Sequence, residues 1–577
     1  MNSIWVILTS IIIFVFAYRI YGEFIAKRIF KVNPDNKLPS FEMQDDIDYV
    51  PTNKEVLFGH HFASIAGTGP IVGPAIAVIW GWVPALIWVI LGSIFAGAVH
   101  DYAALMMSVR NKGLSLAKLS KNVINNRVRL LLLIVVLFTL WIVVAIFGMV
   151  IAAIFKMYPQ AVFPVWVQIP IAMVIGWLAY KKKFNLTVLS IVAVVLMYLS
   201  IIIGVHFPFV MPVIFGINPM TIWIIILFVY AYIASVLPVW TLLQPRDFVN
   251  SHQLIIGIAL ITLGVFVARP VMIAPALQLA PKGAPPILPF IFITIACGAI
   301  SGFHSLVSSG TTSKQLKSEK NAKLIGYGGM LTEGFLAVLV IVAISAGLGM
   351  YTRTENGEIL AGLQAWQHHY SSWSVAQGLT AKVTAFVNGA ANLLNALSIP
   401  YKYGQAIVGV LIASFAGTTL DTATRIQRYM INELAHDANI KPLQKRHPAT
   451  FVAVFSAALL AFSQGGGMGA LSLWPMFGIS NQLLAGLGLL IAAVYLMKRN
   501  INVWPILIPM LLMIVISSWA MIINLRIFMG TGKIGLAIIC GVMFLLELWM
   551  ICESAMYLVR MKRPGFGVRV SGSDRGM

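Results

Sequence analysis

Two adjacent histidines open the part of the chain whose residue types are best suited to chemistry. Residues 59–74 read GHHFASIAGTGPIVGP. A histidine with an unperturbed pKa of about 6.5 changes charge at cell pH, so His60 and His61 suit a proton gate or a contact with a solute. A pair that lies at the membrane interface and bonds a neighbouring loop is the equally supported alternative.

The rest of this stretch predicts an interruption in a helix. Its glycines permit unwound backbone, and Pro70 and Pro74 each remove a hydrogen-bond donor. A half-helix that begins at such a break presents free N–H groups and about half a positive charge, which suits a carboxylate. The predicted solute contacts at this break are Gly67, Thr68, Gly69 and Pro70.

A second break is predicted in the segment ASVLPVWTLLQPRD, residues 234–247, because Pro238 lies deep in an apolar run. Ser235 and Pro238 are the predicted solute contacts there. Four spans separate the two breaks, and the two broken helices would run in opposite directions, which favours an inverted repeat. Two half-helices meeting at mid-membrane would hold a small anionic organic solute without a buried arginine.

Hydroxyl groups gather in the segment SGFHSLVSSGTTSK, residues 301–314. Hydroxyl and carbonyl oxygens suit a hard cation such as Na⁺, which Ser308 and Ser309 would hold opposite the backbone of the first break. Coupling to a proton through His304 or Lys314 is the alternative. Hydroxyls that bond back to the i−4 carbonyl would instead be structural.

Two carboxylates lie within apolar runs. Glu333 is deep in its run, where it must pair or stay protonated, so it would either relay protons or lock two helices together. Asp421, with Arg425 one turn further on, predicts an ion pair within one helix. No cofactor is predicted beyond the coupling ion, H⁺ or Na⁺. The predicted ion-coupling residues are His60, His61, Ala66, His304, Ser308, Ser309, Thr311, Lys314 and Glu333.

The elements that position these residues must lie in lipid. The chain has 577 residues, of which 59% are hydrophobic and 10% charged, with a mean hydropathy of +0.89. Soluble domains carry roughly 25% charged residues. The net charge is +21, but the basic residues sit in short loops between apolar runs, so they indicate membrane topology and not a nucleic-acid partner. The predicted partners are the bilayer and a small-molecule solute.

The apolar runs predict an all-α polytopic membrane protein with about fifteen spans, in a range of 14 to 17. Residues 383–399 are too short and too rich in small residues to count as a span. The predicted divisions are an N-terminal span and linker (1–56), a first inverted repeat (57–206), a second repeat (207–424) that contains an external loop (351–379), and a cytoplasmic loop with further spans (425–577).

Basic loops fix the predicted orientation. Residues 109–129, 313–323 and 425–447 are rich in lysine and arginine, and all three fall on one side if the N-terminus is outside. The tail from Arg560 is then cytoplasmic. Three scattered cysteines predict neither a disulfide framework nor a metal site.

Four long motifs, in order along the chain, resemble the carbon starvation protein A (CstA) family. They are DYVPTNKEVLFGHHFASIAGTGPIVGP (48–74), SGFHSLVSSGTTSK (301–314), FAGTTLDTATRIQRYMINEL (415–434) and LWPMFGISNQLLAG (473–486). The resemblance implies a secondary transporter of the inner membrane for pyruvate or small peptides, active in carbon starvation. It also implies the five-plus-five, LeuT-like core of the amino acid–polyamine–organocation superfamily, with broken first and sixth helices.

The leading hypothesis is therefore import of a small carboxylate-bearing solute by ion-coupled alternating access, with protons as the expected ion. A sodium-coupled amino-acid or peptide symporter is the alternative within the same class. A membrane-embedded enzyme or a starvation sensor is the alternative of another class. The sequence contains no GxxxxGK[ST], GxSxG or HExxH motif and no large soluble domain, so an ATP-driven pump, an enzyme and a sensor are all disfavoured.

Overall fold

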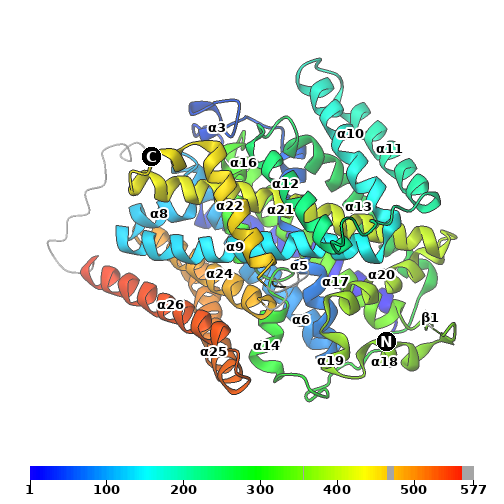
Figure 1. Ribbon diagram of the computed structural model, residues 1–577. Coiled ribbons are helices and arrows are strands. Elements are labelled where there is room, and N and C mark those ends of the chain that lie inside the picture. The colour runs from blue at the N-terminus through cyan, green and yellow to red at the C-terminus, as the bar shows by residue number, and fades with distance from the viewer. Residues whose placement is uncertain (355, 464–468, 470–472, 562–577) are drawn as a thin grey trace.

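The structure, a computed structural model, describes residues 1–354, 356–463, 469 and 473–561. Helices dominate the described residues (Figure 1). Two short antiparallel strands, β1 (Thr352–Arg353) and β2 (Ile359–Leu360), form a hairpin in the loop predicted to be external.

The longer helices of the first half are α1 (Ser3–Phe16), α4 (Lys54–Ile65), α5 (Gly69–Ala77), α6 (Trp82–Gly92), α7 (Ala98–Val109), α9 (Asn126–Met157), α10 (Val162–Tyr180), α11 (Leu186–His206), α12 (Pro219–Val236) and α13 (Leu243–Ala268). Those of the second half are α14 (Ile287–Thr294), α15 (Gly302–Gly310), α17 (Gly329–Val342), α20 (Leu379–Asn395), α21 (Tyr401–Asp437), α22 (Arg446–Ala461), α24 (Trp474–Met497), α25 (Trp504–Gly530) and α26 (Ile534–Met561). Shorter helices are α2 (Gly22–Phe24), α3 (Pro39–Glu42), α8 (Leu116–Val123), α16 (Glu319–Ala322), α18 (Gly362–Tyr370) and α19 (Trp373–Ala376).

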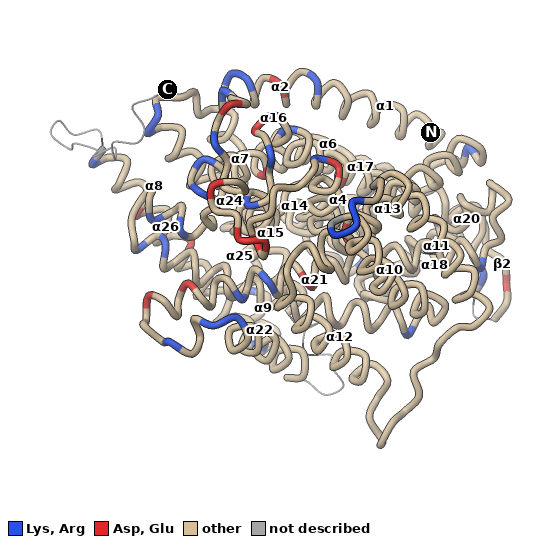
Figure 2. Tube along the Cα trace, turned by 90° about the horizontal axis from the view of Figure 1, so that it is seen from above, with Lys and Arg blue, Asp and Glu red and all other residues tan. Residues whose placement is uncertain are grey.

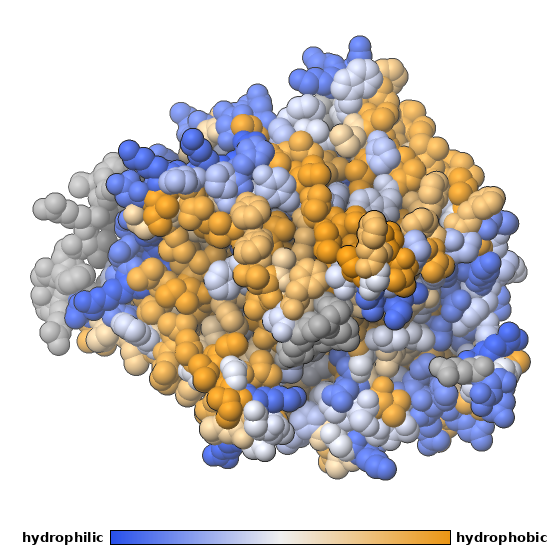
Figure 3. Space-filling view, viewed as in Figure 1, coloured by the Kyte–Doolittle hydropathy of each residue, from blue (hydrophilic) through white to orange (hydrophobic). Residues whose placement is uncertain are grey.

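Twelve helices of the described residues are long and apolar enough to cross a membrane, or thirteen if the bent pair α4–α5 is one span. The count is lower than the predicted fifteen because two predicted spans contain short helices. The first, near residues 287–303, is split between α14 and α15, and the second corresponds to α22, which has 16 residues. Figure 3 shows a broad hydrophobic field between hydrophilic faces, as expected for a chain that contacts lipid.

The loops gather at two opposite ends of the helical body. At one end, the N-terminus bonds the end of α13, where the amide of Ser3 donates to Pro270 O at 3.1 Å, and β1, α18 and α19 lie nearby (Figure 1). At the other end, the hydroxyl of Ser40 donates to Leu316 O at 2.6 Å and joins the linker to the basic loop after α15. Most lysines and arginines lie around α2, α8, α16 and α22 (Figure 2). The loops predicted to be cytoplasmic thus share one end. Which end faces the cytoplasm stays a prediction, and residues 562–577 of the basic tail lie outside the described residues.

The first predicted break is confirmed. Helix α4 ends at Ile65, α5 begins at Gly69, and the two helices are bent by 45° relative to each other. The break spans only residues 66–68, because Pro70 occupies the first turn of α5, where its missing donor costs nothing. Pro74 lies inside α5, so the unwound segment is shorter than the sequence indicates.

The prediction of a second break at residues 234–247 is wrong. Pro238 lies in the connection between two complete spans, because α12 ends at Val236 and α13 begins at Leu243. The second irregular segment is residues 295–301, between α14 and α15. The prediction relied on proline as the sign of a break. The irregular segment instead contains the small residues Ala296–Gly298 and Ser301–Gly302, which permit close backbone contact.

Side chains of α24 complete the hydrogen bonds at this second break. The amide of Asn481 donates to Cys297 Sγ at 3.3 Å, and its oxygen accepts the backbone N–H of Phe303 at 2.9 Å. The amide of Gln482 donates to Phe292 O at 2.9 Å. One helix therefore bonds the chain on both sides of residues 295–301, which explains the chemistry of the motif LWPMFGISNQ.

The two breaks lie directly against each other. A Cβ atom placed on Gly69 would lie 2.4 Å from Cys297 Sγ, and one placed on Gly298 would lie 3.5 Å from the Cα of Pro70. Helix α13 packs along α4, and α24 packs along α15. The predicted start of a second repeat at residue 207 stays a prediction. The inverted repeat itself stays a prediction.

We expect Gly69→Ala to lower the thermal midpoint of the purified protein, because its new methyl group would overlap the side chain of Cys297. Adding Cys297→Gly in the same chain should restore most of the loss. Gly535→Ala is the control, since a Cβ there meets nothing within 4 Å. A double variant no more stable than Gly69→Ala would contradict this close contact of the breaks.

Candidate functional site

The first break is covered by neighbouring side chains. A Cβ atom on Gly67 would lie 2.6 Å from Thr419 Oγ1 and 2.7 Å from Phe147 Cε1. The carbonyl of Ser64, near the end of α4, accepts a hydrogen bond from Thr419 at 3.1 Å. The hydroxyl of Thr68 is buried and has no hydrogen-bond partner among the described residues. Side chains of α9 and α21 therefore cover the backbone of this break. The role of residues 67–70 as solute contacts stays a prediction.

A buried arginine is the centre of the polar network beside the break. Arg246, on α13, donates to the carboxylate of Asp421 on α21 and to the hydroxyl of Tyr230 on α12. It also donates to Thr418 Oγ1 at 2.9 Å and forms an ion pair with Asp247 at 3.2 Å. Tyr230 in turn donates to Asp421 at 2.8 Å. Three helices thus converge on one cation that is only 2% exposed.

Sequence analysis missed this arginine. Arg246 stands in the segment QPRD, where the prediction rested on the prolines and not on the charged residue beside them. The structure therefore contains a buried arginine beside the break, and the expectation that a solute is held without one stays a prediction. The predicted pair of Asp421 with Arg425 is also wrong, because Asp421 pairs with Arg246 on another helix. The rule that an ionisable residue within a membrane is a candidate for function would have identified Arg246.

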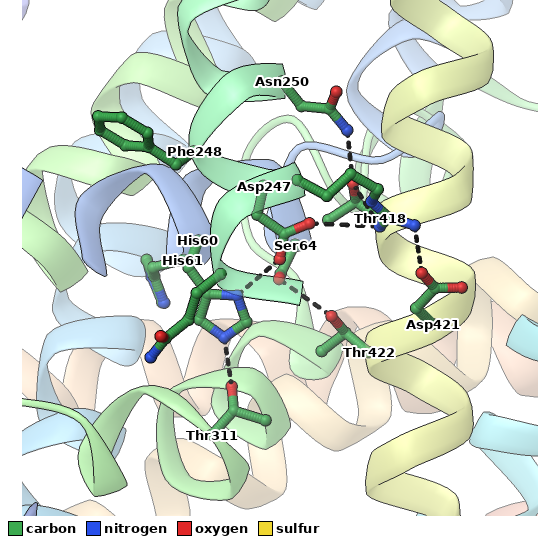
Figure 4. A network of polar contacts seen from close by, with 12 residues as sticks. His60, His61, Ser64, Asp247, Phe248, Asn250, Thr311, Thr418, Asp421 and Thr422 are labelled. Carbon is green, nitrogen blue, oxygen red and sulfur yellow. Dashed lines mark hydrogen bonds and ion pairs between the residues drawn. The ribbon is translucent and has the colours of Figure 1, made fainter. Parts of the chain in front are cut away.

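His60 extends the network to the first broken helix. Its Nδ1 lies 2.6 Å from Asp247 Oδ2 and its Nε2 lies 3.4 Å from Thr311 Oγ1 (Figure 4). His61 Nδ1 lies 2.9 Å from Thr312 Oγ1. Both histidines are completely buried. They therefore link α4 to α13 and to the turn that follows α15, and whether the pair lies at the membrane interface stays a prediction.

Glu333 belongs to a second buried cluster. His304 Nε2 lies 3.3 Å from the carboxylate of Glu333, and His304 Nδ1 lies 2.9 Å from Asp101. His100 lies 2.9 Å from the other oxygen of Asp101. These groups bring α7, α15 and α17 together, but neither oxygen of Glu333 has a hydrogen-bond partner among the described residues, so its role as a lock between helices stays a prediction. A role in proton relay stays a prediction.

The hydroxyls after His304 mostly bond their own helix. Ser309 and Thr311 donate to the carbonyls of Ser305 and Val307, at 2.7 and 3.2 Å. Ser309 also accepts the backbone N–H of Leu116 at 3.2 Å, which directs it toward α8. Ser308 is buried with no hydrogen-bond partner among the described residues. A sodium site at Ser308, Ser309 and the carbonyls of Ala66 and Gly69 stays a prediction. The hydroxyl of Ser309 already makes two hydrogen bonds to backbone groups.

A recess borders Arg246 and Tyr230. Its empty volume, which includes space open to the outside, is about 310 Å³, and the centre of a water-sized sphere reaches about 20 Å³ of it. The N–H groups Trp166 Nε1 and Arg246 Nε are buried without a hydrogen-bond partner among the described residues. The remaining walls are Ile151, Val165, Gln168, Ile169, Leu227, Ala413 and Gly417. The recess therefore combines mainly apolar walls with unused hydrogen-bond donors.

The recess adjoins the first break. Phe147 and Thr419, which cover Gly67, lie within about one helical turn of its wall residues Ile151 and Gly417. Ser235, a predicted solute contact, is buried at the end of α12. Neither Ser235 nor Pro238 lines the recess. The prediction of Ser235 and Pro238 as solute contacts depends on a broken helix there, and the structure has no broken helix at that place.

The family model described as Carbon starvation protein CstA matches residues 2–520. The chain belongs to this family. It is 35% identical to the "Peptide transporter CstA" of Bacillus subtilis (strain 168), with 95% of each chain covered. It is 32% identical to the "Pyruvate/proton symporter BtsT" of Escherichia coli (strain K12), with 90% of this chain and 81% of that protein covered. These CstA-family relatives are named as transporters and not as enzymes.

Solved structures show a more distant likeness. One is a point mutant of the manganese transporter of Eremococcus coleocola, with a TM-score of 0.44 and 13% identity over 89% of this chain and 99% of the other. Another is a Na⁺-coupled sialic acid symporter, with a TM-score of 0.43 and 12% identity over 96% of this chain and 97% of the other.

The linker motif of the CstA family bonds the end of the site helix α21. Asp48 accepts hydrogen bonds from Arg425 at 3.1 Å and Tyr429 at 2.6 Å. Arg425 also donates to the carbonyls of Ala234 and Leu237, at 2.9 and 2.5 Å, which completes the end of α12. Burial would raise the pKa of Asp48, but Arg425, Lys314 and Arg428 outweigh it and lower the pKa to about 2. Lys314, a predicted coupling residue, stacks over the ring of Tyr429 at 4.1 Å.

We expect Asp48→Asn to cost about 2 kcal/mol of stability at neutral pH, because it removes charged hydrogen bonds to Arg425. The lowered pKa makes this contribution complete above pH 4 or so and lost as the pH falls toward about 2. Thermal midpoints of wild type and variant should therefore converge in acid. Asp35→Asn, an exposed change in the same linker, is the control. A gap that does not depend on pH would contradict the ion pair.

Proposed function

We propose that this chain is a secondary active transporter that imports a small carboxylate-bearing solute across the cytoplasmic membrane, with protons as the coupling ion. The observation that carries the proposal is the buried Arg246 beside a recess with unused N–H donors. A planar guanidinium with several donors is the side chain best suited to a carboxylate. The relatives named for peptide and pyruvate transport handle solutes of this chemistry.

The recess is too small for such a solute unless its walls separate. Its 20 Å³ suit a water molecule. Alternating access requires one group of helices to move against another, and the recess lies where α10, α12, α13 and α21 meet. Movement of α10 or α12 away from α21 would enlarge the space without exposing the first break to lipid.

Protons are favoured over sodium by the types of residue near the first break. Histidine and carboxylate side chains form two clusters here. In one, His60 of α4 pairs with Asp247; in the other, His304 of α15 lies beside Asp101 and Glu333. Histidine and carboxylate are side chains that can carry a proton between them, so these clusters suit a proton better than a metal cation. Of the two hydroxyls predicted to hold sodium, Ser309 donates to the carbonyl of Ser305, and Ser308 has no hydrogen-bond partner among the described residues. Accumulation of solute driven by a pH gradient, in the absence of sodium, would support this choice of ion.

We expect Arg246→Lys to reduce uptake of labelled pyruvate or dipeptide into proteoliposomes by at least about tenfold. Lysine keeps the charge that Asp421 requires but loses the paired donors of the guanidinium, worth about 1.4 kcal/mol or more. Arg269→Gln, an exposed change at the other end of α13, is the matched control and should transport normally. The thermal midpoint of Arg246→Lys separates a loss of binding from a loss of fold. Wild-type uptake by a folded Arg246→Lys protein would remove Arg246 from the solute site.

A further inference from the structure

The partners of Arg246 make it able to exchange one carboxylate for another. Asp421 is completely buried, and both Arg246 and Tyr230 bond the same oxygen, Oδ2. Its other oxygen, Oδ1, has no hydrogen-bond partner among the described residues. Both residues that hold Asp421 also line the recess. A solute carboxylate that enters the recess therefore meets a cation that is already paired.

The count of buried charges decides what must accompany the solute. Arg246 contributes one positive charge and faces two carboxylates, Asp421 and Asp247, the second of which is also held by His60. A solute carboxylate adds a further negative charge to a site of low dielectric. An uncompensated charge there costs several kcal/mol. A proton that arrives with the solute removes this cost.

Other charged groups on α21 and on the neighbouring helix α22 have partners of their own. On α21 itself, Arg425 pairs with Asp48. From α22, Arg446 donates to the carbonyl of Val236, and His447 lies 3.0 Å from the hydroxyl of Tyr232. The groups that act directly on Asp421 are Arg246 and Asp247 on α13 and Tyr230 on α12, with His60 on α4 behind Asp247.

Asp421 is the acid best placed to take the proton. Asp247 is held on one oxygen by His60 and on the other by Arg246, so protonating it would disturb α4 as well. Asp421 has a free oxygen for the proton, and once neutral it can still accept the hydrogen bond of Tyr230. The acids of the second cluster, Asp101 and Glu333, do not line the recess and do not compete with a solute there.

We propose that Asp421 and the solute carboxylate alternate as the partner of Arg246, and that one proton on Asp421 accompanies each solute carboxylate. This inference rests on the proposed function. A proton from the aqueous side binds the Asp421 carboxylate, Arg246 is released, and the solute carboxylate accepts its N–H donors. No bond in the solute changes, and the net charge of the site is conserved.

The exchange also favours a class of solute. A monocarboxylate that enters with one proton carries no net charge across the membrane. A zwitterionic peptide with one proton would carry one positive charge, and its ammonium group would find no aspartate or glutamate among the residues that line the recess. The site therefore fits a short monocarboxylate such as pyruvate better than a peptide.

Binding of pyruvate to the purified full chain tests the exchange. Affinity of the wild type should weaken by up to roughly tenfold per pH unit as the pH rises, because deprotonated Asp421 competes for Arg246. Asp421→Asn should bind pyruvate with an affinity independent of pH, and in proteoliposomes it should exchange pyruvate without accumulating it in response to a pH gradient. Asp421→Glu should restore the pH dependence. Glu547→Gln, a buried acid held by Ser517 and Ser518 in the last spans, is the matched control and should behave as wild type.

Several outcomes would overturn the inference. An Asp421→Asn protein that accumulates pyruvate with wild-type pH dependence would exclude Asp421 as the proton site. If this variant does not fold, the wild type alone still decides: an imposed membrane potential at constant pH should not change its pyruvate uptake, and stimulation by a negative interior would refute one proton per carboxylate. Wild-type protein that binds neither pyruvate nor dipeptide at any pH would contradict the proposed function itself, whereas binding that does not depend on pH would contradict only the exchange.

Discussion

Backbone groups released inside a membrane must be satisfied by the protein itself, and this constraint organises the structure. Water is not there to bond them, and each unpaired group costs several kcal/mol. At the first break, Thr419 of α21 bonds the carbonyl of Ser64. At the second break, Asn481 and Gln482 of α24 bond both sides of residues 295–301. Each interruption of a helix thus requires a polar side chain from a distant segment, and these requirements bring the distant segments together.

The same rule, applied to charges, explains the polar interior. Arg246, Asp421, Asp247 and His60 come from three helices and lie within a largely apolar body. Each is buried, so none of them is tolerable without the others. A network of this kind is sensitive to any additional charge, and this is the property that an ion-coupled transporter needs. The polarity that holds α4, α13 and α21 together is therefore also what links a solute to a proton in the proposed function.

The two clusters of acid and histidine differ in their access to space. The cluster at Arg246 borders the recess, whereas the cluster of Asp101, His304 and Glu333 is enclosed between α7, α15 and α17. The first cluster adjoins two buried N–H donors without a hydrogen-bond partner among the described residues, Arg246 Nε and Trp166 Nε1, on residues that line the recess. The enclosed cluster ties the helices that surround the second break.

The sequence by itself determined the membrane class, most of the apolar helices and the first break. These features depend on local composition. Long apolar runs are stable in lipid, and glycine with proline interrupts a helix through its own backbone geometry. The sequence also identified His60, His304 and Glu333, since an ionisable residue in an apolar run is conspicuous.

Only the tertiary structure decided which residues meet. Asp421 pairs with Arg246, which is 175 positions away, and not with Arg425 one turn along its own helix. The second break lies at residues 295–301 because α24 supplies the amides that bond it there, and Pro238 lies harmlessly between two spans. Pairings of this kind depend on how whole helices pack against one another. The spacing of residues along one helix does not predict which residues of another helix they will contact.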